Sequence, residues 1–300
     1  MFKINKNKYV LIIIIISIFS TGCDINIEKI NPLASPPKEK TPIKIGVSMA
    51  TTKEDVYPII KKAIMKNKDK EKVTIIWKVA NDDLKKQKKD IANLIQKKVD
   101  IIIYHAVDTT KKGKVVIEQA LDANIPVVAM DRLPQDCKVD AYVSADSFKV
   151  GQLQVRYLTE QLEEKGKIVI LKGDKDNNVS KDISKGIKKE LNKNDKIEVA
   201  KEEFHKNWSK DLAKKTIKKI ISTNKDIKGI IANNDDLALG AMEVMKDNNL
   251  NDQVIIIGAD GNKKATTAIA KEEMEATIDK MPYLLGLNSL KVASFIARGQ

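Results

Sequence analysis

Cysteine and histidine are scarce in this sequence of 300 residues, which contains only 2 of each. Cys23 and Cys137 stand in different contexts, and Cys137 has no partner with which to form a structural disulfide. His105 and His205 are far apart, so neither a metal cluster nor an activated nucleophile is predicted. The sequence therefore indicates a protein that is not an enzyme and holds no metal.

Glycine is absent from the turn after the first predicted strand, between Ser48 and Thr52. A dinucleotide fingerprint needs glycines at that turn so that the backbone can approach a pyrophosphate. A phosphate loop of the form Gly-x-x-x-x-Gly-Lys-Ser/Thr is also missing from the sequence. We therefore predict no nucleotide cofactor.

Aromatic residues make up 4% of the chain, while its formal net charge is +13. A basic chain can bind nucleic acid. Here, however, lysines alternate with acidic residues, arginines are few, and no basic stripe carries interleaved aromatics. The charge is typical of a solvated surface. The low counts of 8 prolines and 13 glycines favour a globular chain. A length of 300 residues leaves room for two lobes.

The first residues resemble an export signal. Lysines within residues 3–8 precede an apolar run over residues 9–19, and small residues then lead to Cys23. The apolar run is shorter than the roughly 20 residues that a membrane span needs. We expect residues 1–23 to be a lipoprotein signal with lipid attached at Cys23; simple secretion and an uncleaved anchor are the alternatives. Residues 24–42, with four prolines, are predicted to be a tether.

From residue 43 onward, short apolar runs alternate with helical patterns. Strands are predicted over 45–50, 73–79, 100–106, 126–130, 141–144, 167–171, 197–204, 229–232, 253–259 and 275–279. This alternation predicts an α/β fold of two doubly wound parallel-sheet lobes joined by a multi-strand hinge. The first lobe is expected to comprise residues 43–145 plus 262–300 and the second lobe residues 146–261.

Polar side chains follow several of these strands, and ligands bind at the carboxyl ends of strands in open α/β sheets. Planar carboxylate, amide and guanidinium groups can bridge the neighbouring hydroxyls of a sugar, and an aromatic ring can stack on its C–H face. Some polar residues have a purely structural reading: Asp146 and Asp236 as helix caps, and Asn233 bonded at its own turn. Trp77 and Tyr104 are expected to be packing residues, whereas Trp208 is equally suited to packing and to stacking.

Several motifs carry a resemblance that covers residues 44–300. They are Met130-Asp131-Arg132, the run from Tyr142 to Gln154, Asp176-Asn177-Asn178, Asn207-Trp208, Ala232 to Asp235, Gly258-Ala259-Asp260 and Thr277 to Lys280. In these the chain resembles the periplasmic sugar-binding proteins of the ribose/galactose/xylose type, of type I fold, most closely those that bind D-xylose. The resemblance implies ligand contacts from Asp131, Arg132, Asp176, Asn178, Trp208, Asn234, Asp260 and Lys280. The sequence departs from the family pattern after the first strand, where Thr51 to Glu54 stand in place of the usual charged or polar pair.

The resemblance implies a lipid-anchored receptor on the extracytoplasmic face of the cell membrane. Its expected ligand is one monosaccharide, with D-xylose preferred, and its expected partner is an ABC sugar permease or, alternatively, a sensor histidine kinase. A sugar-responsive repressor would need a DNA-binding motif before residue 44, where the signal segment stands instead. Family members usually add one more strand to the second lobe after the last helix, and the resemblance leaves open whether this chain continues past Gln300.

Overall fold

The computed structural model describes residues 42–53, 55–223 and 226–300. The predicted signal segment, Cys23 and all but the last residue of the predicted tether lie outside the described residues. Within the described ranges, no helix is both long and apolar enough to cross a membrane.

Two parallel five-stranded sheets form the frames of two lobes, which confirms the predicted α/β class. The first sheet has the order β2-β1-β3-β4-β5 and the second the order β10-β9-β8-β6-β7. The strands of the first sheet are β1 (Ile43–Met49), β2 (Val73–Val79), β3 (Ile101–Tyr104), β4 (Val127–Met130) and β5 (Ala141–Val143). Those of the second sheet are β6 (Gly166–Lys172), β7 (Ile197–Phe204), β8 (Gly229–Ala232), β9 (Ile255–Asp260) and β10 (Ala276–Asp279).

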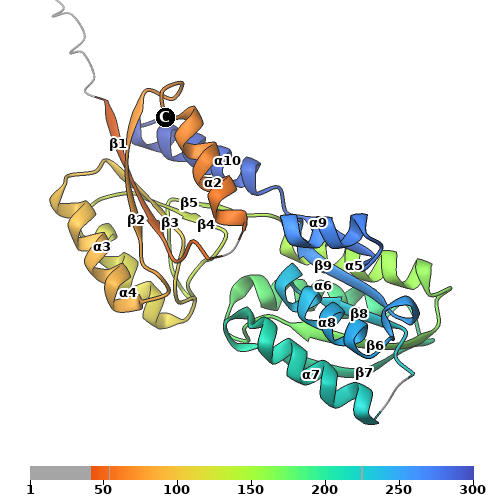
Figure 1. The fold of residues 1–300 in the computed structure, drawn as a ribbon. Helices are drawn as coiled ribbons and strands as arrows, with labels where there is room; N and C mark the ends of the chain where they lie inside the picture. Colours follow the sequence, from red (N-terminus) through yellow and green to blue (C-terminus); the bar gives the residue numbers. More distant parts are fainter. Residues whose placement is uncertain (1–41, 54, 224–225) are drawn as a thin grey trace, which may run out of the picture. The chain divides into compact units, whose positions relative to one another are not determined.

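Helices cover both faces of each sheet (Figure 1). The helices of the first lobe are α2 (Val56–Asn67), α3 (Leu84–Gln96), α4 (Lys111–Asp122) and α10 (Pro282–Ala297). Those of the second lobe are α5 (Ser147–Gln161), α6 (Asn178–Leu191), α7 (Lys210–Thr223), α8 (Asp235–Asp247) and α9 (Lys263–Ala270), with the short 3-10 turns η2 (Lys206–Trp208) and η3 (Asn251–Gln253). Strands covered on both faces are expected to be continuously apolar, as β3 and β8 are.

Successive residues of β3 belong to different cores because side chains alternate across a strand. Ile101 and Ile103 pack with α2 and α10, whereas Ile102 and Tyr104 pack with α3 and α4. Tyr104 is fully buried, which confirms its predicted packing role. The second sheet is built in the same way, with α7, α8 and α9 over one face and α5 and α6 over the other.

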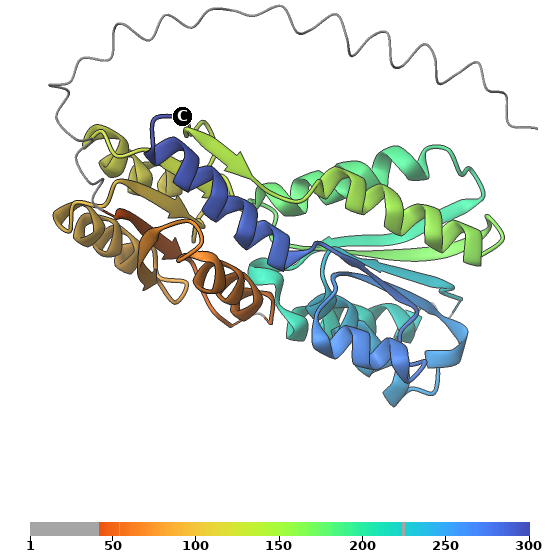
Figure 2. The same ribbon diagram turned by 90° about the horizontal axis from the view of Figure 1, so that it is seen from above.

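The chain returns to the first lobe later than the sequence analysis predicts. Residues 262–279 are predicted from the sequence to belong to the first lobe, but β10 pairs with β9 in the second sheet, with Thr277 opposite Gly258. Parallel pairing with β9 gives β10 its hydrogen-bond partners, and Ala276 and Ile278 pack on the second-lobe core. Only α10 crosses back, to pack beside α2 (Figures 1 and 2). The expected boundary near residue 261 is therefore wrong, and the crossing lies at Lys280.

Helices α5 and α6 approach closely at two glycines. A Cβ atom on Gly151 would lie 2.1 Å from the carbonyl oxygen of Ile183, and one on Gly186 would lie 2.0 Å from that of Phe148. Backbone cannot move aside as a flexible side chain can, so any side chain at either position forces the helices apart.

Gly151→Ala should therefore lower the free energy of unfolding by about 2 kcal/mol, even though alanine is the better helix former. Urea denaturation monitored by circular dichroism measures the loss. Lys149→Ala, in the same helix and on its more exposed side, should stay within about 0.5 kcal/mol of the wild type. Equal stabilities for Gly151→Ala and Lys149→Ala would contradict this packing.

Candidate functional site

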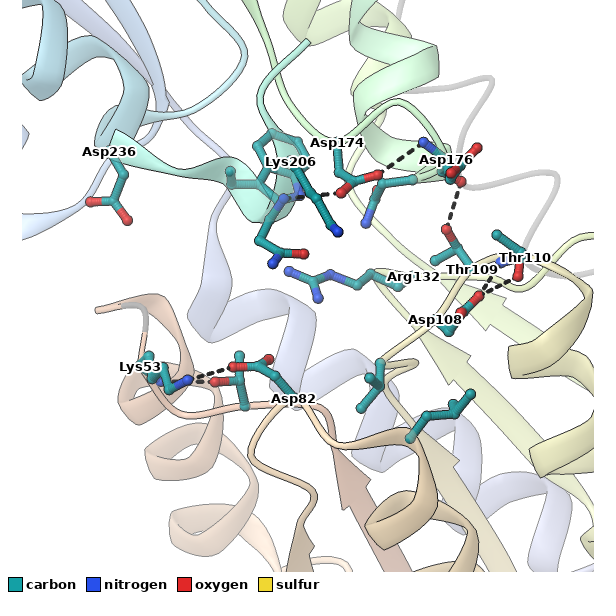
Figure 3. A pocket seen from close by; sticks show the side chains of 16 residues that line it. Lys53, Asp82, Asp108, Thr109, Thr110, Arg132, Asp174, Asp176, Lys206 and Asp236 are labelled. Atoms are coloured by element: carbon teal, nitrogen blue, oxygen red, sulfur yellow. Dashed lines mark hydrogen bonds and ion pairs between the residues drawn. The ribbon is translucent and has the colours of Figure 1, made fainter. Parts of the chain in front are cut away.

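A cleft of about 630 Å³ lies at the carboxyl ends of strands from both sheets (Figure 3). One wall carries Lys53 and Asp82, and the other carries Asp174 and Lys206 (Figure 3). The remaining lining residues are Thr51, Leu84, Val107, Asp108, Thr109, Thr110, Arg132, Asp176, Asn177, Asn207, Trp208 and Asp236. The cleft is thus lined mainly by polar and charged groups, as a ligand rich in hydroxyls requires.

A smaller recess shares Arg132 and Trp208 with the cleft. Its other lining residues are Asp131, Val179, Asn234, Asp260 and Lys280. The recess therefore gathers six of the eight residues that the sequence analysis proposed as ligand contacts, from both lobes and from the crossing.

Three charged side chains form the base of the recess. Lys280 Nζ lies 3.3 Å from Asp260 Oδ1 and 3.8 Å from Asp131 Oδ1, and the side chains of all three are no more than 16% exposed. Burial by itself would raise the pKa of Asp131, but Lys280, a hydrogen bond with His105, and Arg132 outweigh burial and hold that pKa well below its usual range. Asp131 is therefore ionised at neutral pH and accepts hydrogen bonds only.

Behind Asp131, two buried first-lobe residues fix the position of the neighbouring groups. His105 Nδ1 accepts a hydrogen bond from the backbone N–H of Ala50 at 3.3 Å, which places the ring proton on Nε2 in the neutral ring. Nε2 lies 3.3 Å from Tyr57 Oη and 3.6 Å from Asp131 Oδ2. Tyr57 Oη in turn accepts a hydrogen bond from Arg132 Nη2 at 3.1 Å. Asp131 and Arg132 are thus held by one buried network.

Five residues at or beside this site have positive backbone φ angles. The φ angles are +61° at Asp131, +54° at Asn207, +56° at Trp208, +124° at Asp260 and +52° at Met281, next to Lys280. Residues with side chains adopt such angles at a cost of about 1–3 kcal/mol each, and such strain gathers at ligand sites. These backbone conformations set the direction in which the side chains of Asp131, Trp208 and Asp260 leave the chain.

Buried Asp235 joins the loops that carry the second-lobe site residues. Its Oδ2 accepts from the backbone N–H of Asn262 at 2.8 Å, and its Oδ1 accepts from Thr277 Oγ1 at 2.6 Å. Thr277 Oγ1 also accepts from the backbone N–H of Gly261 at 3.2 Å. Desolvation raises the pKa of Asp235 to about 7. One carboxyl group thus ties the segment after Asp260 to strand β10, which leads to Lys280.

Two of the proposed contact residues lie outside the recess. Asp176 lines the wider cleft, and its backbone carbonyl accepts a hydrogen bond from Thr109 Oγ1 at 2.8 Å. Asn178 lines neither cavity: its Nδ2 donates to Tyr142 Oη at 3.0 Å, and its Oδ1 accepts from Leu133 N at 3.2 Å. Asn178 therefore joins the lobes, and its contact with a ligand stays a prediction.

The expected structural roles of the other polar residues are confirmed only in part. Asp146 caps α5 through the N–H of Lys149, as predicted. Asp236 does not cap α8: Asn234 does so, because its side chain lies one residue before the first turn, and Asp236 lines the cleft instead. Asn233 does not bond at its own turn but donates to the carbonyl of Ser180.

Sequence reasoning missed His105 and the residues Asp82 and Asp108 of the cleft. His105 directly follows β3, and the other two follow the carboxyl ends of β2 and β3. Polar residues after a predicted strand pointed to Asp131, and the same criterion applied to every strand of the first sheet points to Asp82 and Asp108. His105 gave no such signal, because it lies inside the predicted strand 100–106. Tyr57, whose hydroxyl holds Arg132, gave no such signal because it lies within α2.

The arrangement suits reversible binding better than covalent chemistry. The carboxylates of Asp131 and Asp260 can accept hydrogen bonds from hydroxyl groups, and Lys280 and Arg132 can donate hydrogen bonds to hydroxyl oxygens. Trp208 supplies a half-buried aromatic ring beside them. Among the residues that the structure describes, no group of three or more His, Cys, Asp or Glu side chains is arranged to hold a metal ion.

The chain is similar in sequence and in fold to known proteins. The chain is 28% identical over 261 residues to the ribose import binding protein of Bacillus subtilis (strain 168), covering 87% of this chain and 84% of that protein. It is 25% identical over 265 residues to the D-xylose-binding periplasmic protein of Escherichia coli (strain K12), covering 86% of this chain and 79% of that protein. An ABC transporter solute binding protein from Bacillus halodurans C-125, solved with bound myo-inositol, shares the fold with a TM-score of 0.81 at 24% identity, over 88% of this chain and 92% of that one.

A family model described as the periplasmic binding protein domain matches residues 45–300, nearly all of the described chain. The chain therefore belongs to the periplasmic binding protein domain family.

Proposed function

We propose that this protein is a receptor that binds one monosaccharide in its cleft and delivers it to an ABC permease. The observation that carries the proposal is the recess in which Asp131 from the first lobe, Asp260 from the second and Lys280 from the crossing converge. A sugar that contacts all three stabilises one arrangement of the lobes, because a ligand shifts a conformational equilibrium only by its differential affinity.

The ligand class that fits best is a pentose or a related cyclic polyol, with D-xylose as the first candidate and D-ribose as the second. The named relatives bind these two sugars, and the charged groups of the recess match vicinal hydroxyls. The same family relationship supports an extracytoplasmic location. The basic start, the apolar run and the small residues before Cys23 support a lipid anchor on Cys23, which would hold the protein at the membrane.

A thermal-shift screen of purified residues 24–300 tests the ligand class. At a concentration one hundred times the dissociation constant, a ligand stabilises the native state by about 2.7 kcal/mol. For a protein of this size we expect Tm to rise by about 5 °C with one pentose and by much less with unrelated sugars. Trp208→Ala should abolish the rise while the protein stays folded. No shift with any pentose, hexose or cyclic polyol would contradict the proposal.

Deletion of the gene distinguishes an ABC permease from a sensor histidine kinase as the membrane partner. A receptor for an ABC permease predicts loss of uptake at low sugar concentration, with uptake restored by the wild-type gene. Intact uptake together with lost induction of sugar-responsive genes would indicate a sensor histidine kinase instead.

A further inference from the structure

The ring of Trp208 packs directly on the backbone of Gly173, the residue that follows strand β6. A Cβ atom built on Gly173 would lie 2.4 Å from Cζ3 and 2.5 Å from both Cε3 and Cη2 of Trp208. These three atoms belong to the six-membered ring, so the ring occupies the space that a side chain at residue 173 would need. Gly173 itself is buried and lies outside the lining of the cleft.

The turn that carries Trp208 is fastened to the same end of β6. The backbone N–H of Asn207 donates to Asp174 Oδ2 at 3.0 Å, and the buried ring of His205 lies 2.9 Å, through Nδ1, from the carbonyl oxygen of Lys172. The backbone N–H of Trp208 donates to the carbonyl of His205 at 3.0 Å. These bonds hold two consecutive residues, Asn207 and Trp208, in left-handed conformations, which a free turn would not keep.

We infer that Gly173 is a positioning residue that sets the depth of the cleft by fixing where the Trp208 ring lies. The ring is held in place before any ligand arrives, since its position depends on contacts within the second lobe. A ring displaced from Gly173 changes the space that it lines beside Asp260 and Asn234. The position of the ring therefore determines which cyclic polyols fit in the cleft. This role in selection rests on the proposed function. The position of the ring against Gly173 does not.

Fluorescence of the ligand-free protein tests the ring's position. The chain has 2 tryptophans, so a Trp77→Phe background leaves Trp208 as the only indole; Trp77 Nε1 has no hydrogen-bond partner, so its loss breaks no hydrogen bond. In this background Gly173→Ala should shift the emission to longer wavelength and increase quenching by acrylamide. Gly229→Ala is the matched control, because its Cβ would lie 2.9 Å from the side chain of Leu158 in the same lobe. The control should leave the emission unchanged.

A double-mutant cycle separates the ring contact from a general packing defect. Trp208→Phe lacks the outer ring that meets Gly173, so Gly173→Ala should lower Tm by less than half as much in the Trp208→Phe background as in the wild type. An equal loss of Tm in both backgrounds, or unchanged Trp208 emission in Gly173→Ala, would overturn the inference.

Binding titrations with the pentose found by the thermal screen test the selection itself. Gly173→Ala should weaken binding at least tenfold, whereas Gly229→Ala should stay within threefold of the wild type. Unchanged affinity despite a displaced ring would refute the role in selection. Failure of the wild type to bind any sugar would instead refute the proposed function and leave the fluorescence and Tm results to decide the ring's position.

Discussion

Asp260→Gly is expected to abolish sugar binding while the protein remains as stable as the wild type to within about 1 kcal/mol. The φ angle of +124° at Asp260 is strained for any residue with a side chain, and glycine removes that strain, which is worth about 1–3 kcal/mol. The free energy gained by removing this strain offsets the loss of the ion pair between Asp260 and Lys280. Lys280 keeps Asp131 as a partner.

The affinity for the sugar should fall because the Asp260 carboxylate is one of the two anionic hydrogen-bond acceptors of the recess. Loss of its hydrogen bonds to hydroxyl groups should weaken affinity at least about a hundredfold, or roughly 2.7 kcal/mol. Isothermal titration measures affinity, and urea denaturation measures stability. Alanine is a poorer test because it keeps the strain and removes only the charge.

Asp136→Gly provides the control for this substitution. Asp136 also has a positive φ, +53°, but it is exposed and lies outside both cavities. Asp136→Gly should remove a similar amount of backbone strain and bind the sugar with wild-type affinity. Binding by Asp260→Gly within threefold of wild type would contradict the proposed site.

Stability should fall as pH rises from about 4 to about 7 because of Asp235. Desolvation raises the pKa of this carboxyl group from 3.8 to about 7, so between these values the folded state binds a proton that the unfolded state has released. The proton stabilises the folded state fully below the unfolded pKa, and this stabilisation is lost as pH rises through the folded pKa. A shift of this size corresponds to about 4 kcal/mol.

The comparison of wild type with Asp235→Asn isolates this contribution from those of other groups. Asp236, whose pKa burial also raises, acts in the same direction in both proteins. The difference in unfolding free energy between Asp235→Asn and wild type should increase in favour of the variant from pH 4 to pH 7 and stay constant above pH 8. A difference that does not vary with pH would show that Asp235 titrates normally.

The fold and most of the recess followed from sequence because both depend on local patterns. Apolar runs marked the buried strands, and polar residues at their carboxyl ends, such as Asp131 in the first lobe and Asp260 in the second, had to lie at the carboxyl edge of their own parallel sheet. Lys280 came only from the family resemblance, since nothing in composition or spacing distinguishes it from the many surface lysines.

The sequence predictions were wrong where the position of a residue depends on contacts with distant parts of the chain. The sequence contains no local sign that β10 pairs with β9, because a short strand at a sheet edge looks the same in either lobe. The side chain of Asn178 was available for a ligand by sequence, yet Tyr142 and Leu133 of the other lobe bind both ends of its amide. The contact between Gly173 and Trp208 joins two loops that are separated in sequence, so no local sequence pattern indicates it.

Calorimetric titration of residues 24–300 with D-xylose and D-ribose tests the central claim most directly. We predict saturable heat with one sugar bound per chain for at least one of them, lost in Asp260→Gly and retained in Asp136→Gly. The absence of saturable heat with these and related cyclic polyols, or equal binding by wild type and Asp260→Gly, would contradict the claim that a monosaccharide binds in the cleft and contacts the charged groups of the recess.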